Sequence, residues 1–249
     1  MPRYFITFAY NGKNYVGWQV QPNGTSVQQV LQDALSTILR GRVDIVGAGR
    51  TDAGVHARRM MAHFDWVGDV ILPADLVYKL NNLLPKDIAV TAIQRVIPDA
   101  HARFSATSRT YSYHITTVKD PFLHEQTYRI HFEPDIERMN QLCAVLMEYN
   151  DFTSFSKLHT DVKTNICRID DAHWERKEDG YIFTIRADRF LRNMVRAITG
   201  TLLEAGRGRL DERGLRRIIE AKNRSVAGDS VPGHALFLEE VTYPGDIWL

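Results

Sequence analysis

The chain has 249 residues, a formal net charge of +1, 44% hydrophobic residues and 24% charged residues. This balance is typical of a globular protein and excludes collagen-like, low-complexity and disordered chains. Its two cysteines, Cys143 and Cys167, are too few for a disulfide framework or a four-cysteine metal site. Because no segment of about 20 apolar residues and no secretory signal pattern is present, we expect a cytoplasmic protein that does not contact membranes.

The first hundred residues alternate between strand-like and helix-like patterns. Apolar residues within 27–38 recur at helical spacing, Ser26 or Thr25 can cap this helix, and Gly41 follows its end. Leucines within 76–84 predict a second helix. Runs of β-favouring residues predict strands at 4–10, 43–46, 60–64 and 88–97.

The second part of the chain repeats this style. The strand predicted at 109–118 alternates, which places Tyr111 and Tyr113 on one face. Asp135 can cap a helix at 136–147. Further elements are a hairpin of 166–176 and 181–187, a helix at 191–202 ending by Gly206, a short helix at 215–219 and a strand at 235–243. We therefore predict an α+β protein whose two halves, 1–104 and 105–249, divide near residues 101–105.

Positive charge is concentrated in two places. Segment 186–224 carries eleven Lys and Arg against five Asp and Glu, a net charge of +6 that leaves −5 for the remainder. The second concentration consists of Arg40, Arg42, Arg50, Arg58 and Arg59, opposed by Asp44 and Asp52. Such patches attract polyanions even when the total charge is near zero. Solvated helix faces are the alternative interpretation.

A glycine-rich loop at 47–54 is the first candidate for chemistry. Three glycines in eight residues allow a sharp turn and the close approach of a ligand. Asp52 lies two residues after Arg50, and a carboxylate beside a guanidinium stays ionised and can act as a nucleophile or base. The glycine spacing fits neither dinucleotide nor nucleotide-phosphate loops. A structural turn is the competing interpretation.

Other candidate residues carry weaker signals. The nine histidines show no paired metal-binding spacing. Cys143 lies on the apolar stripe of its predicted helix and is expected to pack there. Arg192 and Arg196 lie one turn apart on the predicted 191–202 helix, where one of them could reach a carboxylate or both could be solvated.

Taken together, the chain resembles the tRNA pseudouridine synthase A family over nearly its whole length. The shared strings are YNGKNYVGWQ at 10–19, SVQQVLQDAL at 26–35, AGRTDAGVHA at 48–57, HARFSATSRTYSY at 101–113, DFTSF at 151–155, FLRNMVR at 190–196 and ALFLEEVTYP at 235–244. AGRTDAGVHA is highly specific by itself. The chain departs from the family pattern at Asn11, often Asp, and at Ala235, usually Gly, and neither residue touches the proposed chemistry.

The resemblance implies the roles of particular residues. Asp52 aligns with the catalytic aspartate, Tyr111 with a tyrosine that contacts the target base, and Arg50 and Arg196 with arginines near that aspartate. Arg58, Arg192 and Arg207 are candidate contacts to the tRNA backbone.

The resemblance also implies a fold and partners. The fold would be two similar α/β-sandwich halves that form one extended, mixed, mostly antiparallel sheet, with helices on one side and a central active-site cleft. The protein would be a homodimer without cofactor or metal that binds the anticodon arm of tRNA. The split near Ser105 would place Asp52 on one half and Tyr111 and Arg196 on the other.

The implied reaction converts uridine to pseudouridine at tRNA positions 38, 39 and 40. Asp52 could attack C1′, remove a sugar proton to give a glycal, or add to C6 of the base, and the sequence does not choose among these routes. Two other functions are weighed against it. A non-catalytic RNA-binding module would bind tRNA without isomerisation. A nucleosidase would release free base, but it usually needs two carboxylates, whereas the loop supplies one.

Overall fold

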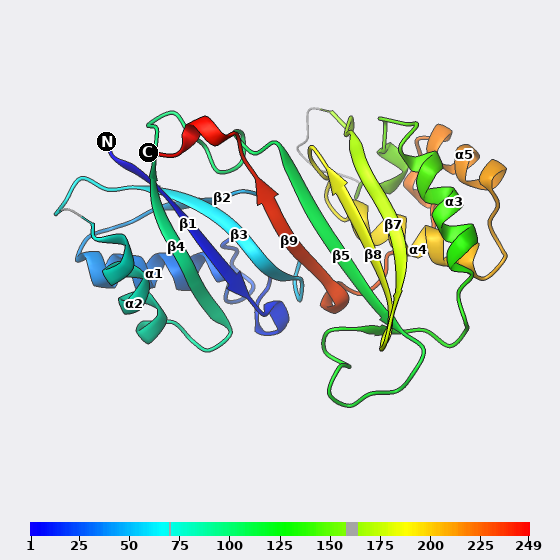
Figure 1. The fold of residues 1–249 in the computed structure, drawn as a ribbon, viewed down its shortest axis with the longest axis horizontal. Coiled ribbons are helices and arrows are strands. Elements are labelled where there is room, and N and C mark those ends of the chain that lie inside the picture. Colours follow the sequence, from blue (N-terminus) through cyan, green and yellow to red (C-terminus); the bar gives the residue numbers. More distant parts are fainter. Residues whose placement is uncertain (70, 158–163) are drawn as a thin grey trace. The chain divides into compact units, whose positions relative to one another are not determined.

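The backbone forms two units, each with its own strands and helices. The structure is a computed structural model that describes residues 1–69, 71–157 and 164–249. Unit 1 comprises Met1–Thr107 and Phe237–Leu249, and unit 2 comprises Ser108–Leu236 (Figure 1). The last strand of the chain thus belongs, from Phe237 onward, to the unit formed by the first 107 residues.

Unit 1 is a mixed sheet with two α-helices. In spatial order its main strands are β4, β1, β3 and β9, and β2 pairs with β3. All of these pairs are antiparallel except the parallel pair of β3 and β9. The elements are β1 (Arg3–Tyr10), α1 (Val27–Leu39), β2 (Ile45–Gly47), β3 (His56–Asp65), α2 (Pro73–Leu83), β4 (Ile88–Val96) and β9 (Leu236–Thr242).

The described residues of unit 2 form a three-stranded antiparallel sheet and three α-helices. Strand β8 lies between β5 and β7, and the two-residue β6 pairs in parallel with β5. The elements are β5 (Ser108–Thr116), β6 (Tyr128–Arg129), α3 (Ile136–Leu146), β7 (Ile169–Lys177), β8 (Gly180–Ala187), α4 (Met194–Gly206) and α5 (Glu212–Glu220). The predicted α+β class, with mixed and mostly antiparallel strands, is confirmed.

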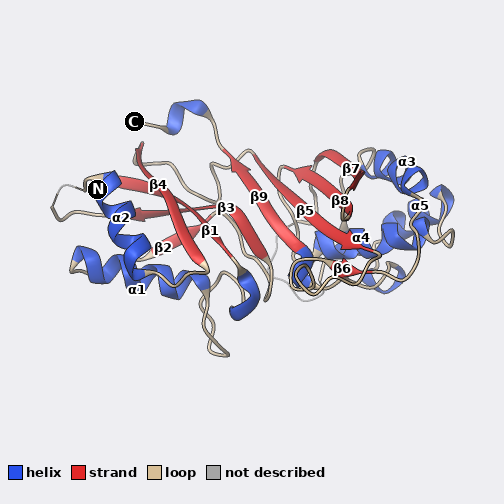
Figure 2. Cartoon of the chain, turned by 60° about the horizontal axis from the view of Figure 1, so that its bottom comes forward, coloured by secondary structure: helices blue, strands red, loops and turns tan. Residues whose placement is uncertain are grey.

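Local sequence signals explain where several elements begin. The side chains of Ser26, Asp135 and Asp211 accept hydrogen bonds from backbone N–H groups in the first turns of α1, α3 and α5. Such caps satisfy donors that the helix itself leaves unpaired. In unit 1, α2 packs against β4 and α1 packs against α2, so the amphipathic faces of both helices are covered (Figure 2).

Two predicted boundaries are corrected, and one strand was not predicted. Helix α4 begins at Met194 rather than at residue 191, because Asn193 has a left-handed backbone with φ of 67° that interrupts the helical path. Arg192 therefore precedes the helix, and the prediction that it lies one helical turn from Arg196 is wrong. Strand β3 begins at His56 rather than at residue 60, and the short β6 has no counterpart among the predicted strands.

The core of unit 1 closes around Phe5. This ring is 1% exposed and meets Tyr243 and Trp248 edge-on, with centroids 5.1 and 5.6 Å away. The last residues of the chain thereby cover one side of β1. No helix among the described residues is long and apolar enough to cross a membrane.

His63 is a buried titratable group within this core. It lies opposite Phe5 on β3, and its Nδ1 accepts a hydrogen bond from the backbone N–H of Ala102 at 3.1 Å. Burial, together with the charges of Arg3 and His101, lowers the pKa of His63 to about 4. His63 is therefore neutral at physiological pH, as its acceptor role requires.

This shift predicts acid sensitivity. Because the folded pKa lies below the unfolded value, the contribution of His63 is complete above about pH 6.5 and is lost as the pH falls toward 4. At pH 4.5 this group alone should make the free energy of unfolding lower than at neutral pH by up to about 3 kcal/mol. His63→Asn keeps a hydrogen-bond acceptor but cannot titrate. The free energy of unfolding of this variant, measured in urea, should therefore change less with pH than that of wild type. His124→Asn, in an exposed loop, is the control. An equal change of the unfolding free energy with pH in wild type and in His63→Asn would contradict this assignment.

Candidate active site

The loop that carries Asp52 is held from one side by residues 15–18. Gly17 has a φ of +109°, and a Cβ at this position would lie 2.3 Å from the carbonyl oxygen of Thr51. The N–H of Trp18 donates to that same carbonyl at 3.3 Å, and the hydroxyls of Tyr10 and Thr51 hydrogen-bond at 2.9 Å. Only glycine permits so close an approach with this backbone conformation. The backbone just before Asp52 is thus fixed.

The other end of the loop is held in the same way. A Cβ on Gly12 would lie 2.0 Å from the carbonyl oxygen of Val55, and the Gly12 N–H donates to Nδ1 of His56 at 3.0 Å. The Gly54 N–H donates to the carbonyl of Tyr15 at 3.4 Å, and the Val55 N–H donates to the carbonyl of Asp52 at 3.2 Å. The loop turns back on itself at Asp52, and segment 10–18 determines the path of its backbone.

This fixed backbone presents a partly accessible carboxylate. Asp52 and Thr51 are half-buried, whereas Arg50, two residues earlier, is exposed. Arg58 lies on β3, where its guanidinium pairs with Glu239 at 3.3 Å and lies over the ring of Phe237, 4.8 Å from the centroid. The predicted loop residues Arg50 and Asp52 therefore share one turn of unit 1, and Arg58 lies on the strand that follows it.

Tyr111 lies in unit 2, near the middle of β5. It is opposite Ile185 of β8 and is half-buried. The ring of Phe190 meets it edge-on, with centroids 5.2 Å apart and an interplanar angle of 89°. This geometry is favourable for aromatic pairs and restricts the rotation of the tyrosine ring. Phe190 begins the segment that leads to α4, so that segment and Tyr111 contact each other directly.

Arg196 is held in the first turn of α4 by an extended segment. Its Nε donates to the carbonyl of Val231 at 2.7 Å, and the Val231 N–H donates to the carbonyl of Arg196 at 3.2 Å. The buried hydroxyl of Tyr113 donates to the carbonyl of Pro232 at 2.8 Å, and this hydrogen bond is a second contact that holds the same segment. Burial raises the pKa of Tyr113 above its ordinary value, so this hydroxyl remains a donor. Unit 2 therefore holds the Arg196 side chain through backbone contacts.

The remaining predicted arginines have different surroundings. Arg192 is exposed, and its carbonyl accepts a hydrogen bond from the N–H of Lys157 at 3.0 Å. Arg207 follows the far end of α4, about 16 Å along the helix axis from Arg196. It pairs with Glu204 at 3.2 Å and lies over the ring of Phe132, 4.4 Å from the centroid. The predicted set thus divides between two units: Asp52, Arg50 and Arg58 lie in unit 1, and Tyr111, Arg192, Arg196 and Arg207 in unit 2.

Histidine and cysteine side chains serve the core. His56 and His63 are buried acceptors for backbone N–H groups, and Cys143 and Cys167 are buried and free. Burial raises the pKa of both thiols, so neither is a reactive thiolate. Within residues 1–69, 71–157 and 164–249, no three His, Cys, Asp or Glu side chains gather as a metal site requires.

Segment 10–18 is the functional feature that the sequence analysis left without a role. Gly12 and Gly17 lie five residues apart among aromatic residues, a pattern that indicates turns but not their contacts. Their role depends on Thr51 and Val55, which are distant in the sequence.

The fold and the site define an α+β protein in which a half-buried aspartate lies on a loop whose backbone is held at both ends. A family model described as "tRNA pseudouridine synthase" matches residues 6–105 and 149–244. The chain therefore belongs to the tRNA pseudouridine synthase family, whose members are isomerases that act on tRNA.

Individual relatives agree with this assignment. The chain is 62% identical to a tRNA pseudouridine synthase A of Parabacteroides distasonis, covering 100% of this chain and 98% of the relative. It is 59% identical to the enzyme of that name from Bacteroides thetaiotaomicron, covering 100% and 93% of the two chains. A more distant relative from Exiguobacterium sibiricum, also named tRNA pseudouridine synthase A, is 37% identical over 98% of both chains.

The contact between Gly17 and Thr51 predicts a specific sensitivity. Gly17→Ala places a methyl group against the Thr51 carbonyl in a left-handed conformation and should cost at least about 2 kcal/mol of unfolding free energy. Gly49→Ala, in the same loop, is the matched control because its Cβ would meet no atom within 4 Å. Urea unfolding measures both. Equal stability of the two variants would contradict the proposed constraint.

Proposed function

We propose that this chain isomerises uridine to pseudouridine at positions 38, 39 and 40 in the anticodon stem and loop of tRNA. Asp52 acts as the nucleophile or base, without a cofactor. The observation that supports this most is the Asp52 loop: a half-buried aspartate on a backbone that segment 10–18 holds at both ends. Family membership supplies the reaction class and the tRNA substrate.

The chemistry explains why a fixed carboxylate is needed. The reaction breaks the N1–C1′ bond of uridine and forms a C5–C1′ bond, and the proton on C5 leaves as N1 gains one. No electron is transferred to or from the nucleoside, so a redox cofactor has no role. Attack on C1′, removal of a sugar proton and addition to C6 all require an ionised acid at a defined position. Asp52 supplies that group in each route.

Tyr111 and Arg196 are proposed to act on the same uridine. The Tyr111 ring, restrained by Phe190, contacts the face of the uracil while it is detached and assists removal of the C5 proton. The Arg196 guanidinium, aligned by the Val231 carbonyl, binds the substrate as a charged hydrogen-bond donor. Arg50, exposed beside Asp52, contacts the flanking nucleotide.

Binding of the substrate is proposed to use the basic segments. Since a base inside a stem or loop is stacked, the target must be flipped out, and arginines hold the phosphates beside it. Arg58, Arg192 and Arg207 are the candidate contacts. Arg58 already pairs with Glu239, and Arg207 with Glu204. Part of the binding free energy that each arginine gains from a phosphate is therefore offset by the loss of its glutamate partner.

The assembly and location are proposed from the same resemblance. The active form is a homodimer in the cytoplasm, and the two buried free cysteines are consistent with a reducing compartment. Sedimentation equilibrium of the purified protein at micromolar concentration would show twice the 28.5 kDa mass of one chain. A single-chain mass would contradict the dimer.

The role of Asp52 predicts a selective loss of chemistry. Asp52→Asn should preserve folding and tRNA binding but reduce tritium release from 5-tritiated uridine in tRNA by at least about 10³-fold. Asp44→Asn is the control, since Asp44 is an exposed acid outside the glycine-rich loop that pairs with Arg42 at 3.2 Å. Normal release by Asp52→Asn would remove Asp52 from its role.

The arginine contacts predict a change in salt dependence. Arg192→Ala should weaken tRNA binding and reduce the slope of log Kd against log salt by about one, as expected for one lost phosphate contact. Arg207→Ala should lose less than the full value of a phosphate contact, because its guanidinium must leave Glu204 to bind phosphate. Filter binding from low to moderate salt measures both. An unchanged affinity and slope in Arg192→Ala would show that this residue does not face the tRNA.

A further inference from the structure

The connection after β4 presents a basic and an aromatic side chain together. In the loop 101–105, Arg103 and Phe104 are both exposed, and the exposed fraction of Phe104 is 76%. The Arg103 guanidinium lies 5.6 Å from the centroid of the Phe104 ring. A single exposed apolar ring is not unusual by itself, but here a guanidinium lies against it. Neither residue has a role in the proposed chemistry of Asp52.

The turn beneath these side chains is closed by its own hydrogen bonds. Nδ1 of His101 accepts from the N–H of Arg103 at 3.1 Å and from the N–H of Phe104 at 3.3 Å. The hydroxyl of Ser105 accepts from the N–H of His101 at 2.9 Å, and the N–H of Ser105 donates to the carbonyl of His101 at 2.9 Å. The backbone that carries Arg103 and Phe104 is therefore ordered before any ligand binds.

Contacts between three rings anchor the turn to the sheet. The Phe104 ring is tilted by 37° against the ring of His101, with centroids 4.4 Å apart, and the His101 ring meets the buried ring of His63 on β3 edge-on, with centroids 4.6 Å apart. Ala102, the residue after His101, donates its N–H to His63, and its carbonyl accepts a hydrogen bond from the hydroxyl of Tyr243 at 2.6 Å. The exposed ring thus stands on a rigid support, and binding to it orders little additional chain.

We propose that Arg103 and Phe104 form a stacking platform for an unpaired nucleobase of the tRNA substrate, with Arg103 contacting the adjacent phosphate. This inference rests on the proposed function, which supplies the RNA. Every nucleobase has a π face that stacks on an aromatic ring, and an arginine beside that ring adds cation–π attraction and charge. A preformed platform loses little conformational entropy on binding.

The base on this platform is distinct from the uridine that reacts. His56 begins β3 directly after the Asp52 loop, and His63 lies seven residues further along the same strand. At about 3.3 Å per residue this is a separation of roughly 23 Å. The same end of unit 1 holds both chain termini: Arg3 donates to the carbonyl of Ala100 at 2.9 Å, and the N–H of Leu249 to the carbonyl of Arg95 at 3.1 Å (Figure 1). The platform therefore holds a second nucleotide of the same tRNA.

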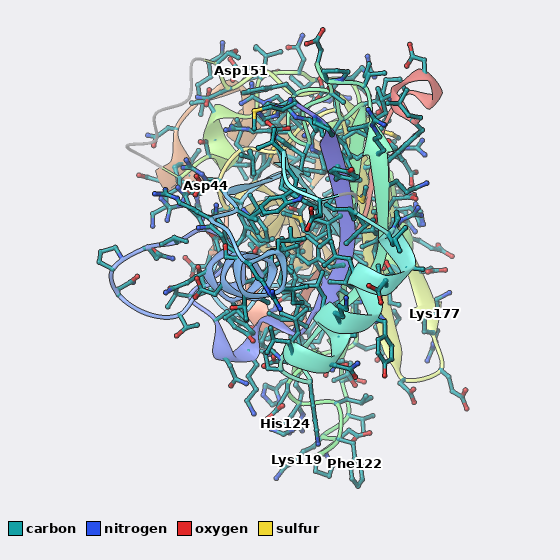
Figure 3. The ribbon with its side chains drawn as sticks, turned by 90° about the vertical axis from the view of Figure 1, so that its left-hand side faces the viewer. Asp44, Lys119, Phe122, His124, Asp151 and Lys177 are labelled. Carbon is teal, nitrogen blue, oxygen red and sulfur yellow. The ribbon has the colours of Figure 1, made fainter. Side chains whose placement is uncertain are left out.

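A second exposed phenylalanine provides a comparison. Phe122 is 90% exposed and lies near Lys119 and His124 on the loop after β5 (Figure 3). Asp120 accepts a hydrogen bond from its N–H at 2.7 Å, and Glu125 follows in the same loop, so this loop carries two acids against one lysine. The charge there does not favour a polyanion, whereas Arg103 touches the ring of Phe104. Phe122 is thus a matched control for an exposed ring without a basic neighbour on it.

The test compares tRNA affinity with turnover. Phe104→Ala should raise the Kd for full-length substrate tRNA by about 5- to 100-fold, the range for loss of one stacked base, with kcat unchanged at saturating tRNA. Phe104→Tyr keeps the ring and should restore affinity. Arg103→Gln should reduce the salt slope of binding by about one. Phe122→Ala should bind as wild type does. A raised KM with an unchanged kcat separates loss of a contact from damage to the fold.

Three results would overturn the platform. Phe104→Ala could bind tRNA as tightly as wild type, or Phe122→Ala could lose affinity to the same extent. A fall in sedimenting mass caused by Phe104→Ala would instead assign the ring to a contact between protein copies. Failure of the proposed function is a separate outcome, because it would appear as wild-type protein that releases no tritium. The binding measurements test the platform whether or not tritium is released.

Discussion

The constraint on which the site depends is the contact between two backbones at Gly17 and Thr51. A glycine with φ of +109° lets residues 17 and 18 approach the carbonyl just before Asp52, and Gly12 does the same for Val55 on the other side of the turn. A loop rich in glycine would otherwise be conformationally free. Its rigidity comes from a segment nearly 40 residues earlier in the chain, so the carboxylate is positioned before substrate arrives, which is what efficient catalysis requires.

Unit 2 uses the same means for the side chains that are assigned to it in the proposed chemistry. The Tyr111 ring is restrained by Phe190, and the Arg196 side chain by the Val231 carbonyl. Gly200 adds to this arrangement, because a Cβ there would lie 1.8 Å from the carbonyl oxygen of Asp229, and so α4 packs directly against the segment that holds Arg196. In each unit, backbone groups and rings contact residues that the proposed chemistry uses.

The sequence predicted those parts of the fold that depend on local patterns. The apolar periodicity and the cap at Ser26 located α1, Asp135 located α3, and the turn at Gly180 located the β7–β8 hairpin. The predicted start of α4 was wrong because Leu191 continues the apolar stripe. The left-handed Asn193, which periodicity does not reveal, keeps residues 191–193 out of the helix. For the site, residue patterns alone indicated only a candidate carboxylate in a glycine-rich loop, and the roles of Asp52 and Tyr111 came from family resemblance. The function of segment 10–18 could not be predicted, since it is defined by contacts to Thr51 and Val55 that only the folded chain forms.

The central claim is that Asp52 in this chain makes pseudouridine in the anticodon arm of tRNA. Its most direct test is to map pseudouridine in tRNA from cells that lack the protein and from the same cells supplied with wild type or with Asp52→Asn. We predict that modification at positions 38, 39 and 40 is lost without the protein, returns with wild type and does not return with Asp52→Asn. Persistence of the modification in cells lacking the protein, or its restoration by Asp52→Asn, would contradict the claim.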